Sequence, residues 1–198
     1  IQKYSDYKNY EIILVDNGSN EEQRKEYEQL SKEYRAEYVY KKMEFHFSKM
    51  CNLGAQRAKG SVFLFLNDDI EITQADWLYR LVGQAQLSHT GAVGVKLVYP
   101  DSNKIQHAGV LNLKTGPSHA LYQMDDSTSY YFGRNVLDYN YCIVTGACLM
   151  IEKSKFLKAG GFDESFPIAY NDVELCFRLL EHGYYNVCLL YTSPSPRD

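Results

Sequence analysis

Short apolar runs alternate with polar, helix-patterned stretches along most of the chain. The clearest run is Val62–Leu66, where apolar residues follow one another without alternation. Such a run is typical of a strand that is covered on both faces of a sheet. Runs rich in aliphatic, β-branched and aromatic residues predict further strands at 10–15, 38–40, 92–99, 141–151 and from 185 onward.

Between the strands, apolar residues recur at the spacing of an amphipathic helix. The pattern predicts helices at 21–38, 47–58, 73–88, 153–159 and 171–182. Ser48 fits an N-cap, and two further helix starts fit capping boxes, Ser19 with Glu22 and Asn171 with Glu174. Because strands and helices alternate up to residue 99, we expect an α/β domain with a mostly parallel central sheet flanked by helices.

Residues 100–140 have a different character, with many turn signals, several tyrosines and one short predicted strand near 110–111. A long irregular section in a compact domain usually serves a binding function. We therefore expect this section to contain contacts to a ligand.

The bulk composition fits one domain and excludes some functions. The chain has 198 residues, of which 45% are hydrophobic, enough for the core of a domain that we assign to residues 1–190. Lys and Arg total 21 against 25 Asp and Glu, so no basic surplus suggests a nucleic acid partner. No apolar run approaches the roughly 20 residues of a membrane-spanning helix.

The cysteines and the tail add two expectations. The five cysteines form no Cys-x-x-Cys pair and fall mostly in apolar patterns. We interpret them as reduced thiols of a cytoplasmic domain, not as disulfides or zinc ligands. Residues 191–198 are polar and contain two prolines, unlike the strand pattern before them. We expect this tail to be non-native or disordered and exclude it from the domain.

Acidic residues stand at the ends of two predicted strands. Asp16 follows the strand at 10–15, and an Asn-Asp-Asp turn at 67–69 follows Val62–Leu66. In open α/β sheets, ligands bind outside the carboxyl ends of the strands, where carboxylates can hold a divalent cation and a phosphorylated ligand. The alternative for the turn at 67–69 is a surface turn with an Asp-rich cap. A third acid, Asp172, opens a helix, where the helix dipole alone also favours a carboxylate.

Several segments around these acids match one known family in the same order along the chain. The matching segments are Glu-Ile-Ile-Leu-Val-Asp-Asn-Gly-Ser at 11–19, Asn-Leu-Gly-Ala at 52–55 leading into 58–60, Phe-Leu-Asn-Asp-Asp at 65–69, Thr-Gly-Ala at 145–147, Gly-Gly-Phe-Asp at 160–163, and Asn-Asp-Val-Glu-Leu at 171–175 with Arg178. Together they resemble the inverting family 2 glycosyltransferases with the GT-A fold, most closely the bacterial enzymes that build cell-surface polysaccharides. The resemblance covers residues 5–190 and implies transfer of a sugar from a nucleotide-diphosphate donor to an acceptor hydroxyl.

The resemblance implies that Asp16 and the acidic turn at 67–69 bind the sugar donor. Asp16 matches the residue that accepts a hydrogen bond from the nucleotide base, which implies a UDP-, dTDP- or GDP-sugar. Asp69 matches the ligand of a Mn²⁺ or Mg²⁺ ion that bridges the donor's diphosphate. Asn67 replaces the first Asp of the family's DXD motif and can still contact the ribose. The residues assigned to nucleotide binding are Asp16, Asn17, Ser19, Asn52, Asn67 and Asp68.

The resemblance also implies a general base and an acceptor site. Asp172 matches the carboxylate that takes the proton of the acceptor hydroxyl as this hydroxyl attacks. The acceptor, a saccharide or a lipid-linked saccharide, would lie beside Gly161, Phe162 and Asn171. A helix cap is the alternative for Asn171. Such acceptors imply a cytoplasmic domain at the inner face of the membrane, with peripheral membrane contact.

The chain departs from the family at both ends. The family's first strand would precede Ile1 and lie beside the strand at 10–15, so two neighbouring strands would lack ladder partners without it. The family also often places a His after the last strand, and residues 191–198 contain none. We therefore expect a fragment that is cut at both ends.

Three other functions compete with sugar transfer. A nucleotidyltransferase would have a Gly-rich phosphate loop with a basic residue near its start, and the sequence has no such loop. An aspartyl-nucleophile phosphatase needs Thr or Ser directly after its Asp-x-Asp motif, where this chain has Ile70. A non-catalytic nucleotide-sugar-binding scaffold, or an inactive fragment, is the remaining alternative. Asn67 favours it and Asp172 opposes it, because binding alone needs no base.

The histidines contribute less to the functional interpretation of the sequence. His46 lies between two phenylalanines, and we interpret it as a packing residue. His107 and His119 lie in the 100–140 section, and we interpret them as loop residues, with contact to a donor sugar as the alternative.

Overall fold

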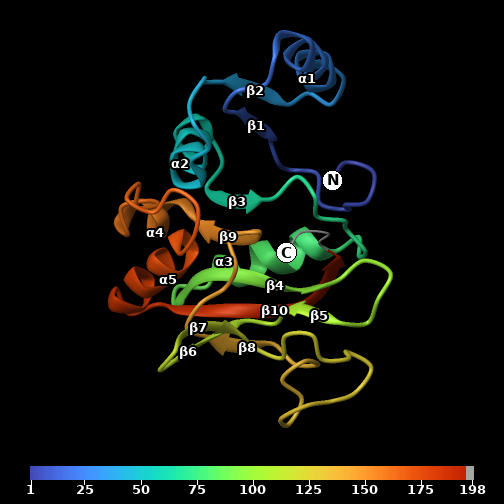
Figure 1. Ribbon diagram of the computed structural model, residues 1–198, viewed down its shortest axis with the longest axis vertical. Helices are drawn as coiled ribbons and strands as arrows, with labels where there is room; N and C mark the ends of the chain where they lie inside the picture. The colour runs from blue at the N-terminus through green and yellow to red at the C-terminus, as the bar shows by residue number, and fades with distance from the viewer. Residues whose placement is uncertain (195–198) are drawn as a thin grey trace.

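Strands and helices alternate along the first hundred residues, as the apolar pattern predicts (Figure 1). The computed structural model describes residues 1–194. The helices are α1 (Glu21–Glu33), α2 (Phe47–Arg57), α3 (Trp77–Ala85), α4 (Lys153–Lys158) and α5 (Asn171–Glu181). The strands are β1 (Ile13–Asp16), β2 (Glu37–Tyr40), β3 (Val62–Leu66), β4 (Thr90–Val98), β5 (Ile105–His107), β6 (Val110–Leu113), β7 (Gly116–His119), β8 (Tyr139–Tyr141), β9 (Cys148–Glu152) and β10 (Tyr185–Pro194).

The central sheet is mixed. Its strand order is β3-β9-β4-β10-β8, with β5 added along β4. β4 and β10 run parallel, whereas β9 runs antiparallel to both β3 and β4. The predicted α/β class is confirmed, but the predicted mostly parallel sheet is wrong. The strand–helix alternation gives only the order of elements up to residue 99, and β9 enters between β3 and β4 from much later in the chain.

Two smaller sheets accompany the central one. β1 and β2 pair in parallel, and β6 and β7 form an antiparallel hairpin. Among the described residues, β1 pairs only with β2 and β3 only with β9, so no ladder joins β1 to β3. We call α1, β1 and β2 the N-terminal layer. In Figure 1 this layer forms the upper part of the molecule, and α2 lies between it and the helices beside the central sheet.

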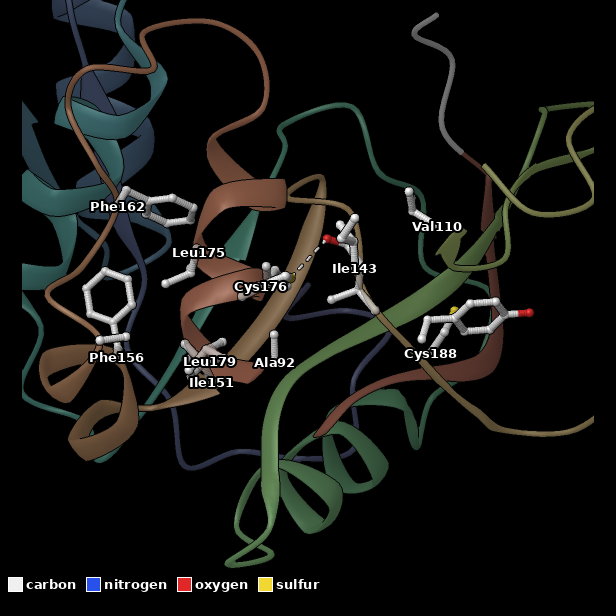
Figure 2. Packing of buried hydrophobic residues seen from close by; sticks show 14 of the residues in the cluster. Ala92, Val110, Ile143, Ile151, Phe156, Phe162, Leu175, Cys176, Leu179 and Cys188 are labelled. Carbon is white, nitrogen blue, oxygen red and sulfur yellow. Dashed lines mark hydrogen bonds between the residues drawn. The ribbon is translucent and has the colours of Figure 1, made fainter. Parts of the chain in front are cut away.

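The core lies on both faces of the central sheet. On one face, α3 packs Trp77 and Leu81 against Val93 of β4. The neighbouring Ala92 faces the other side, as the two-residue period of a strand requires. On that side α4, α5 and the turn between them contribute several of the side chains in Figure 2, among them Phe156, Phe162, Leu175, Cys176 and Leu179.

The first helix begins at Glu21, as predicted, but its capping residue and its end differ from the prediction. Asn20 caps α1 in a reciprocal capping box, so the predicted box at Ser19 is wrong. The backbone N–H of Ser19 donates instead to the Asp16 carboxylate at 3.0 Å. The helix ends at Glu33, before a turn in which Arg35 has a φ of +52° and leads into β2.

Two other predicted caps are also wrong. α2 begins after His46, which is therefore a cap and not only a packing residue. Ser48 is buried, and its hydroxyl donates to the carbonyl oxygen of Phe166 at 2.7 Å. The N-cap of α5 is Tyr170, which has a φ of +63°, so Asn171 is already the first helical residue. The tertiary fold uses the hydroxyl of Ser48, whereas Oδ1 of Asn171 binds the neighbouring residue.

The strand predicted at 141–151 is two strands, β8 and β9, separated by an irregular segment. Residues 100–140, predicted as loops with one short strand, contain β5, β6 and β7. A buried network fixes part of this section. Lys96 donates from Nζ to Asp126 at 2.6 Å and to the carbonyl oxygen of Asn135 at 3.0 Å.

The last described strand continues past the predicted domain boundary. β10 runs to Pro194, and Ser193 pairs with Leu97 of β4, so residue 190 lies inside a strand. Residues 195–198, the rest of the predicted tail, lie outside the described residues. The cysteines are free thiols, as predicted, and three of them are buried. In the described part of the chain no helix has both the length and the apolar character of a membrane span.

The substitution Phe162→Ala tests the core. Its ring is 2% exposed, so we expect a loss of about 3–5 kcal/mol in the free energy of unfolding, because the removed ring leaves a cavity. Urea denaturation followed by circular dichroism measures the loss. Phe132→Ala is the matched control, since that ring is 99% exposed. Equal losses in the two variants would contradict the placement of Phe162.

Candidate active site

The residues 145–147, between β8 and β9, connect two of the predicted acidic sites. The carbonyl oxygen of Ala147 accepts the N–H of Asn67 at 2.9 Å. The N–H of Gly146 donates to Oδ2 of Asp172 at 2.7 Å. We call these residues the 145–147 segment. It brings the turn after β3 and the first turn of α5 together.

The Asp172 carboxylate has a fixed orientation. Its Oδ1 accepts the N–H of Val173 at 2.8 Å, and its Oδ2 accepts the N–H of Gly146. A Cβ at Gly146 would lie 3.4 Å from Cβ of Asp172 and 3.3 Å from the Phe47 ring, so a side chain at this position would crowd both neighbours. Asn171 is buried and accepts the N–H of Asp172 at 2.8 Å, which is a local structural role.

The acid turn at 67–69 lies at the end of β3, as predicted. Asp68 is exposed, whereas Asn67 and Asp69 are half-buried. Both carboxylate oxygens of Asp69 are shielded from solvent. Within the described residues no group of three or more His, Cys, Asp and Glu is arranged to hold a metal. The oxygen donors of this turn fit a hard cation that takes one or two carboxylates from the protein and its other ligands from a substrate.

Asp16 is the last residue of β1, and its carboxylate binds the backbone of the turn that follows. Its carboxylate, 8% exposed, accepts the N–H groups of Gly18 and Ser19, both at 3.0 Å, and the hydroxyl of Tyr38. Burial raises the pKa of Asp16, but these hydrogen bonds to the ionised form outweigh it, so the pKa lies below its usual value. Burial and the Asp16 charge raise the pKa of Tyr38 to about 12.

The other residues of this turn are held to the layer itself. Asn17 donates from Nδ2 to the carbonyl oxygen of Met43 at 3.2 Å and accepts the N–H of Met43 at 2.8 Å. Asp16, Asn17 and Ser19 therefore lie together, as predicted, but on the N-terminal layer and not on the central sheet. The layer contacts α2, where a Cβ at Gly54 would lie 3.3 Å from Val15.

Asn52, predicted to lie near the nucleotide, binds the backbone of a distant turn. Its Nδ2 donates to the carbonyl oxygen of Phe162 at 2.9 Å, and its Oδ1 accepts the N–H of Phe162 at 3.0 Å. Nδ2 also donates to Glu164 at 3.1 Å. Both ends of the amide are thus used to hold this turn. The prediction did not foresee this role, since the partner lies 110 residues away.

Gly161 and Phe162, which were predicted to border the acceptor, lie in one turn, but the Phe162 side chain is buried. The Phe162 ring is buried and packs edge-on against Phe65 at a centroid distance of 4.9 Å, so it faces the core and only its backbone borders the turn. Gly161 has a φ of +76°, and a Cβ there would lie 3.0 Å from Oδ1 of Asn52. Arg178 donates to the carbonyl oxygens of Ala159 and, at 2.7 Å, Gly161. A shallow hollow of about 430 Å³ beside this turn is lined by Asn52, Glu164 and Arg178, among others, and not by the 145–147 segment.

Sequence reasoning missed a histidine pair beside the site. Nδ1 of His107 and Nδ1 of His119 lie 2.8 Å apart. Nε2 of His107 accepts the N–H of Thr145 at 3.4 Å, so the 145–147 segment binds this pair as well. His107 is 1% exposed, and its interpretation as a loop residue is wrong because it lies in β5. No local pattern reveals the pair, since it depends on how β5 and β7 are placed.

The comparison with known families identifies the family of this chain. Residues 1–159 match the family described as glycosyl transferase family 2. The chain belongs to this family. A stretch of 187 residues, or 91% of the chain, is 37% identical to an uncharacterized protein, y4gI, of Sinorhizobium fredii. Over 191 residues the chain is 36% identical to an O-antigen biosynthesis protein, RfbC, of Myxococcus xanthus.

This family 2 chain spans a fifth or less of those two relatives, 20% of the first and 15% of the second. It covers 52% of a more distant relative, the low-salt glycan biosynthesis hexosyltransferase Agl10 of Haloferax volcanii, at 24% identity over 182 residues. The family 2 segment is therefore one part of the longer relatives.

Solved structures confirm the GT-A fold of this family 2 chain. The fold of GalNAc-T7, solved with UDP, GalNAc and Mn²⁺, matches with a TM-score of 0.70 at 17% identity, over 93% of this chain and 37% of that one. The mannosyltransferase PcManGT of Pyrobaculum calidifontis, solved with GDP-Man and Mn²⁺, matches with a TM-score of 0.66 at 14% identity, over 98% of this chain and 49% of that one.

The substitution Tyr38→Phe tests the Asp16 turn. It removes one hydrogen bond to the ionised carboxylate, so the pKa of Asp16 should rise, as an NMR titration of that carboxyl can measure. A lowered folded-state pKa stabilises the fold above the unfolded pKa, and this contribution is lost as the pH falls through the folded pKa. In the variant we expect the ionised Asp16 carboxylate to contribute less to the stability of the fold above the unfolded pKa. Tyr27→Phe is the control, because it removes a hydroxyl from the neighbouring ring; an Asp16 pKa that is the same in both variants would contradict the assignment.

Proposed function

We propose that this domain transfers a sugar from a nucleotide-diphosphate donor to an acceptor hydroxyl, with inversion at the anomeric carbon. One observation carries the proposal. The 145–147 segment holds the acid turn at 67–69 and the Asp172 carboxylate next to one another. A site for diphosphate release and a site for proton removal must be neighbours when both events occur at the same carbon.

Asp172 is the general base in this proposal. The acceptor oxygen forms a bond to the anomeric carbon while the bond from that carbon to the diphosphate breaks, and the hydroxyl proton passes to the Asp172 carboxylate. A positioned base of this kind typically contributes about 10²–10⁴-fold to the rate. The two N–H groups that bind the carboxylate keep it aimed at one place, which such proton transfer requires.

Asp69 would hold a Mn²⁺ or Mg²⁺ ion, with Asp68 beside it. When bound, the ion would neutralise the charge that develops on the leaving nucleoside diphosphate. The shielded carboxylate oxygens of Asp69 fit a ligand of such an ion. Asn67 is held through its backbone N–H to Ala147, so its side chain is available for the ribose.

The nucleotide base would bind at Asp16. A carboxylate has about four acceptor positions, and three N–H or O–H groups already bind this one. The remaining position suits the N–H of uracil, thymine or guanine, with Asn17 and Ser19 beside it. Nucleotides of this kind are present in the two solved structures with the same fold, as UDP and as GDP-Man.

The relatives suggest the setting of the reaction. The O-antigen biosynthesis protein and the glycan hexosyltransferase favour a saccharide or lipid-linked saccharide as acceptor, in the assembly of surface polysaccharide. Work on lipid-linked acceptors would place the domain at the inner face of the cytoplasmic membrane. Gly161 and the backbone of Phe162, together with Asn171, would border the acceptor.

A non-catalytic nucleotide-sugar-binding scaffold is the second candidate. Asn67 in place of an acidic residue favours it. The fixed orientation of Asp172 opposes it, because a binding module has no use for an aimed carboxylate beside the acid turn.

The substitution Asp172→Asn tests the base in the full-length protein. It keeps the shape of the side chain and removes the proton acceptor, so we expect the transfer rate to fall about 10²–10⁴-fold while donor binding is retained. Radiolabel transfer from the nucleotide-sugar measures the rate. Asp101→Asn is the matched control, since Asp101 is an exposed turn residue with a φ of +54° that Asn tolerates. Wild-type turnover in Asp172→Asn would refute the role.

The substitution Asp69→Ala tests the metal ligand. Calorimetric titrations with UDP, GDP and dTDP, each with and without Mn²⁺, should show metal-dependent binding of one nucleotide to the wild-type protein. Asp69→Ala should abolish the metal-dependent part, because the removed carboxylate is the proposed ligand. Metal-dependent binding of unchanged affinity in the variant would argue against Asp69. A folded wild-type protein that binds none of the nucleotides would favour an inactive scaffold or fragment.

A further inference from the structure

The pair of His107 and His119 lies beside the site, and the proposed reaction uses neither residue. His107 is 1% exposed in β5, whereas His119 lies at the end of β7 and is exposed as a residue, although its ring packs against His107 on one side. The rings meet edge to face, with centroids 5.0 Å apart and planes at 81°. A direct contact of Nδ1 with Nδ1 at 2.8 Å requires one proton between the two nitrogens.

The hydrogen bonds assign the proton positions in both rings. Nε2 of His107 accepts two backbone N–H groups, from Gly109 at 3.2 Å and from Thr145 at 3.4 Å, so this nitrogen carries no proton. The neutral ring therefore has its proton on Nδ1 and donates it to Nδ1 of His119. The proton of His119 is then on Nε2. A backbone contact in the interior thus fixes which nitrogen of His119 is the donor.

Both rings are neutral at neutral pH. Burial lowers the pKa of His107 well below its usual value, and the neighbouring His119 lowers it further. Burial also lowers the pKa of His119, more than the negative charge of Asp172 raises it. His119 therefore presents an uncharged N–H group within the field of the Asp172 carboxylate.

The 145–147 segment connects the three parts of the site. Its Ala147 binds the acid turn, its Gly146 binds Asp172, and its Thr145 binds His107. The histidine pair is thus tied to the backbone next to the residue that binds the Asp172 carboxylate. In a single displacement the acceptor hydroxyl lies beside the general base, so the pair is close to where the acceptor would lie.

We propose that His119 donates a hydrogen bond from Nε2 to a hydroxyl oxygen of the saccharide that reacts beside Asp172, and that His107 is the positioning residue that directs this N–H group. The inference rests on the proposed function. Saccharide hydroxyls both donate and accept hydrogen bonds, so a neutral N–H donor next to an accepting carboxylate complements two hydroxyl groups of one sugar. An uncharged donor also leaves the Asp172 carboxylate free of an ion pair, and so able to accept a proton.

The test uses His119→Phe and His119→Gln in the full-length protein. Transfer is measured to methyl glycosides of glucose, galactose, mannose and rhamnose, and calorimetry gives the affinities for UDP, GDP, dTDP and the matching nucleotide-sugars. We expect His119→Phe to raise the acceptor KM about five- to tenfold, the effect of one lost hydrogen bond, with kcat and nucleotide affinity nearly unchanged. His119→Gln keeps an N–H donor and should restore most of the KM. His182→Phe, at an exposed helix end, is the control.

The outcomes show whether the bound hydroxyl belongs to the acceptor or to the donor sugar. A weaker nucleotide-sugar affinity with an unchanged KM for the glycoside would place the hydroxyl on the donor sugar and still support the contact. Unchanged values for both sugars, or equal losses in Phe and Gln variants, would overturn it.

Spectra of the imidazole nitrogens in the unliganded protein test the assignment without any turnover. We expect the proton of His107 on Nδ1 and that of His119 on Nε2, and His107→Phe should release His119 from this single tautomer. A His119 proton on Nδ1 in the wild-type protein would overturn the inference. If the wild-type protein binds no nucleotide while the tautomers are as assigned, the proposed function is what has failed.

Discussion

The backbone of the 145–147 segment is the constraint on which the site depends. Three consecutive residues use their N–H or C=O groups to bind the acid turn, Asp172 and His107. Buried backbone groups need partners, and these three find them in the turn after β3, in Asp172 and in His107. The segment lies in the irregular stretch between β8 and β9. A side chain at Gly146 would crowd Asp172 in this arrangement.

The part of the site that we propose to bind the nucleotide is held in a different way. Asp16 lies on the N-terminal layer, which shares no strand ladder with the central sheet among the described residues. Its place relative to the acid turn depends on α2, which contacts β1 on one side and binds the turn before α5 on the other, through Asn52 and Ser48. Substitutions in α2 would therefore change the distance between Asp16 and the acid turn at 67–69 without altering either of them.

The sequence predicted those parts of the molecule that depend on local pattern. Periodicity and the turn and cap residues along the chain predict the apolar run of β3, the acids at two strand ends and most helices. The predicted cap at Ser48 failed because its hydroxyl binds a distant carbonyl oxygen, and those at Ser19 and Asn171 failed because Asn20 and Tyr170 take the cap positions. The mixed sheet, the partner of Asn52 and the pairing of His107 with His119 depend on which distant segments meet, and no local pattern carries that information. The resemblance located Asp172, but only the fold shows what holds it.

The contacts of α2 also have a consequence for the order of folding. Asn52 binds Phe162, and Ser48 binds Phe166, across 110 and 118 residues of chain. On the ribosome, the N-terminal layer and α2 emerge long before their partners are synthesised. Contacts between residues so far apart in sequence form slowly, and segments that wait for a partner are open to misassembly and to chaperones. The α2 residues that connect the N-terminal layer to the turn before α5 are therefore among the last to find their native contacts.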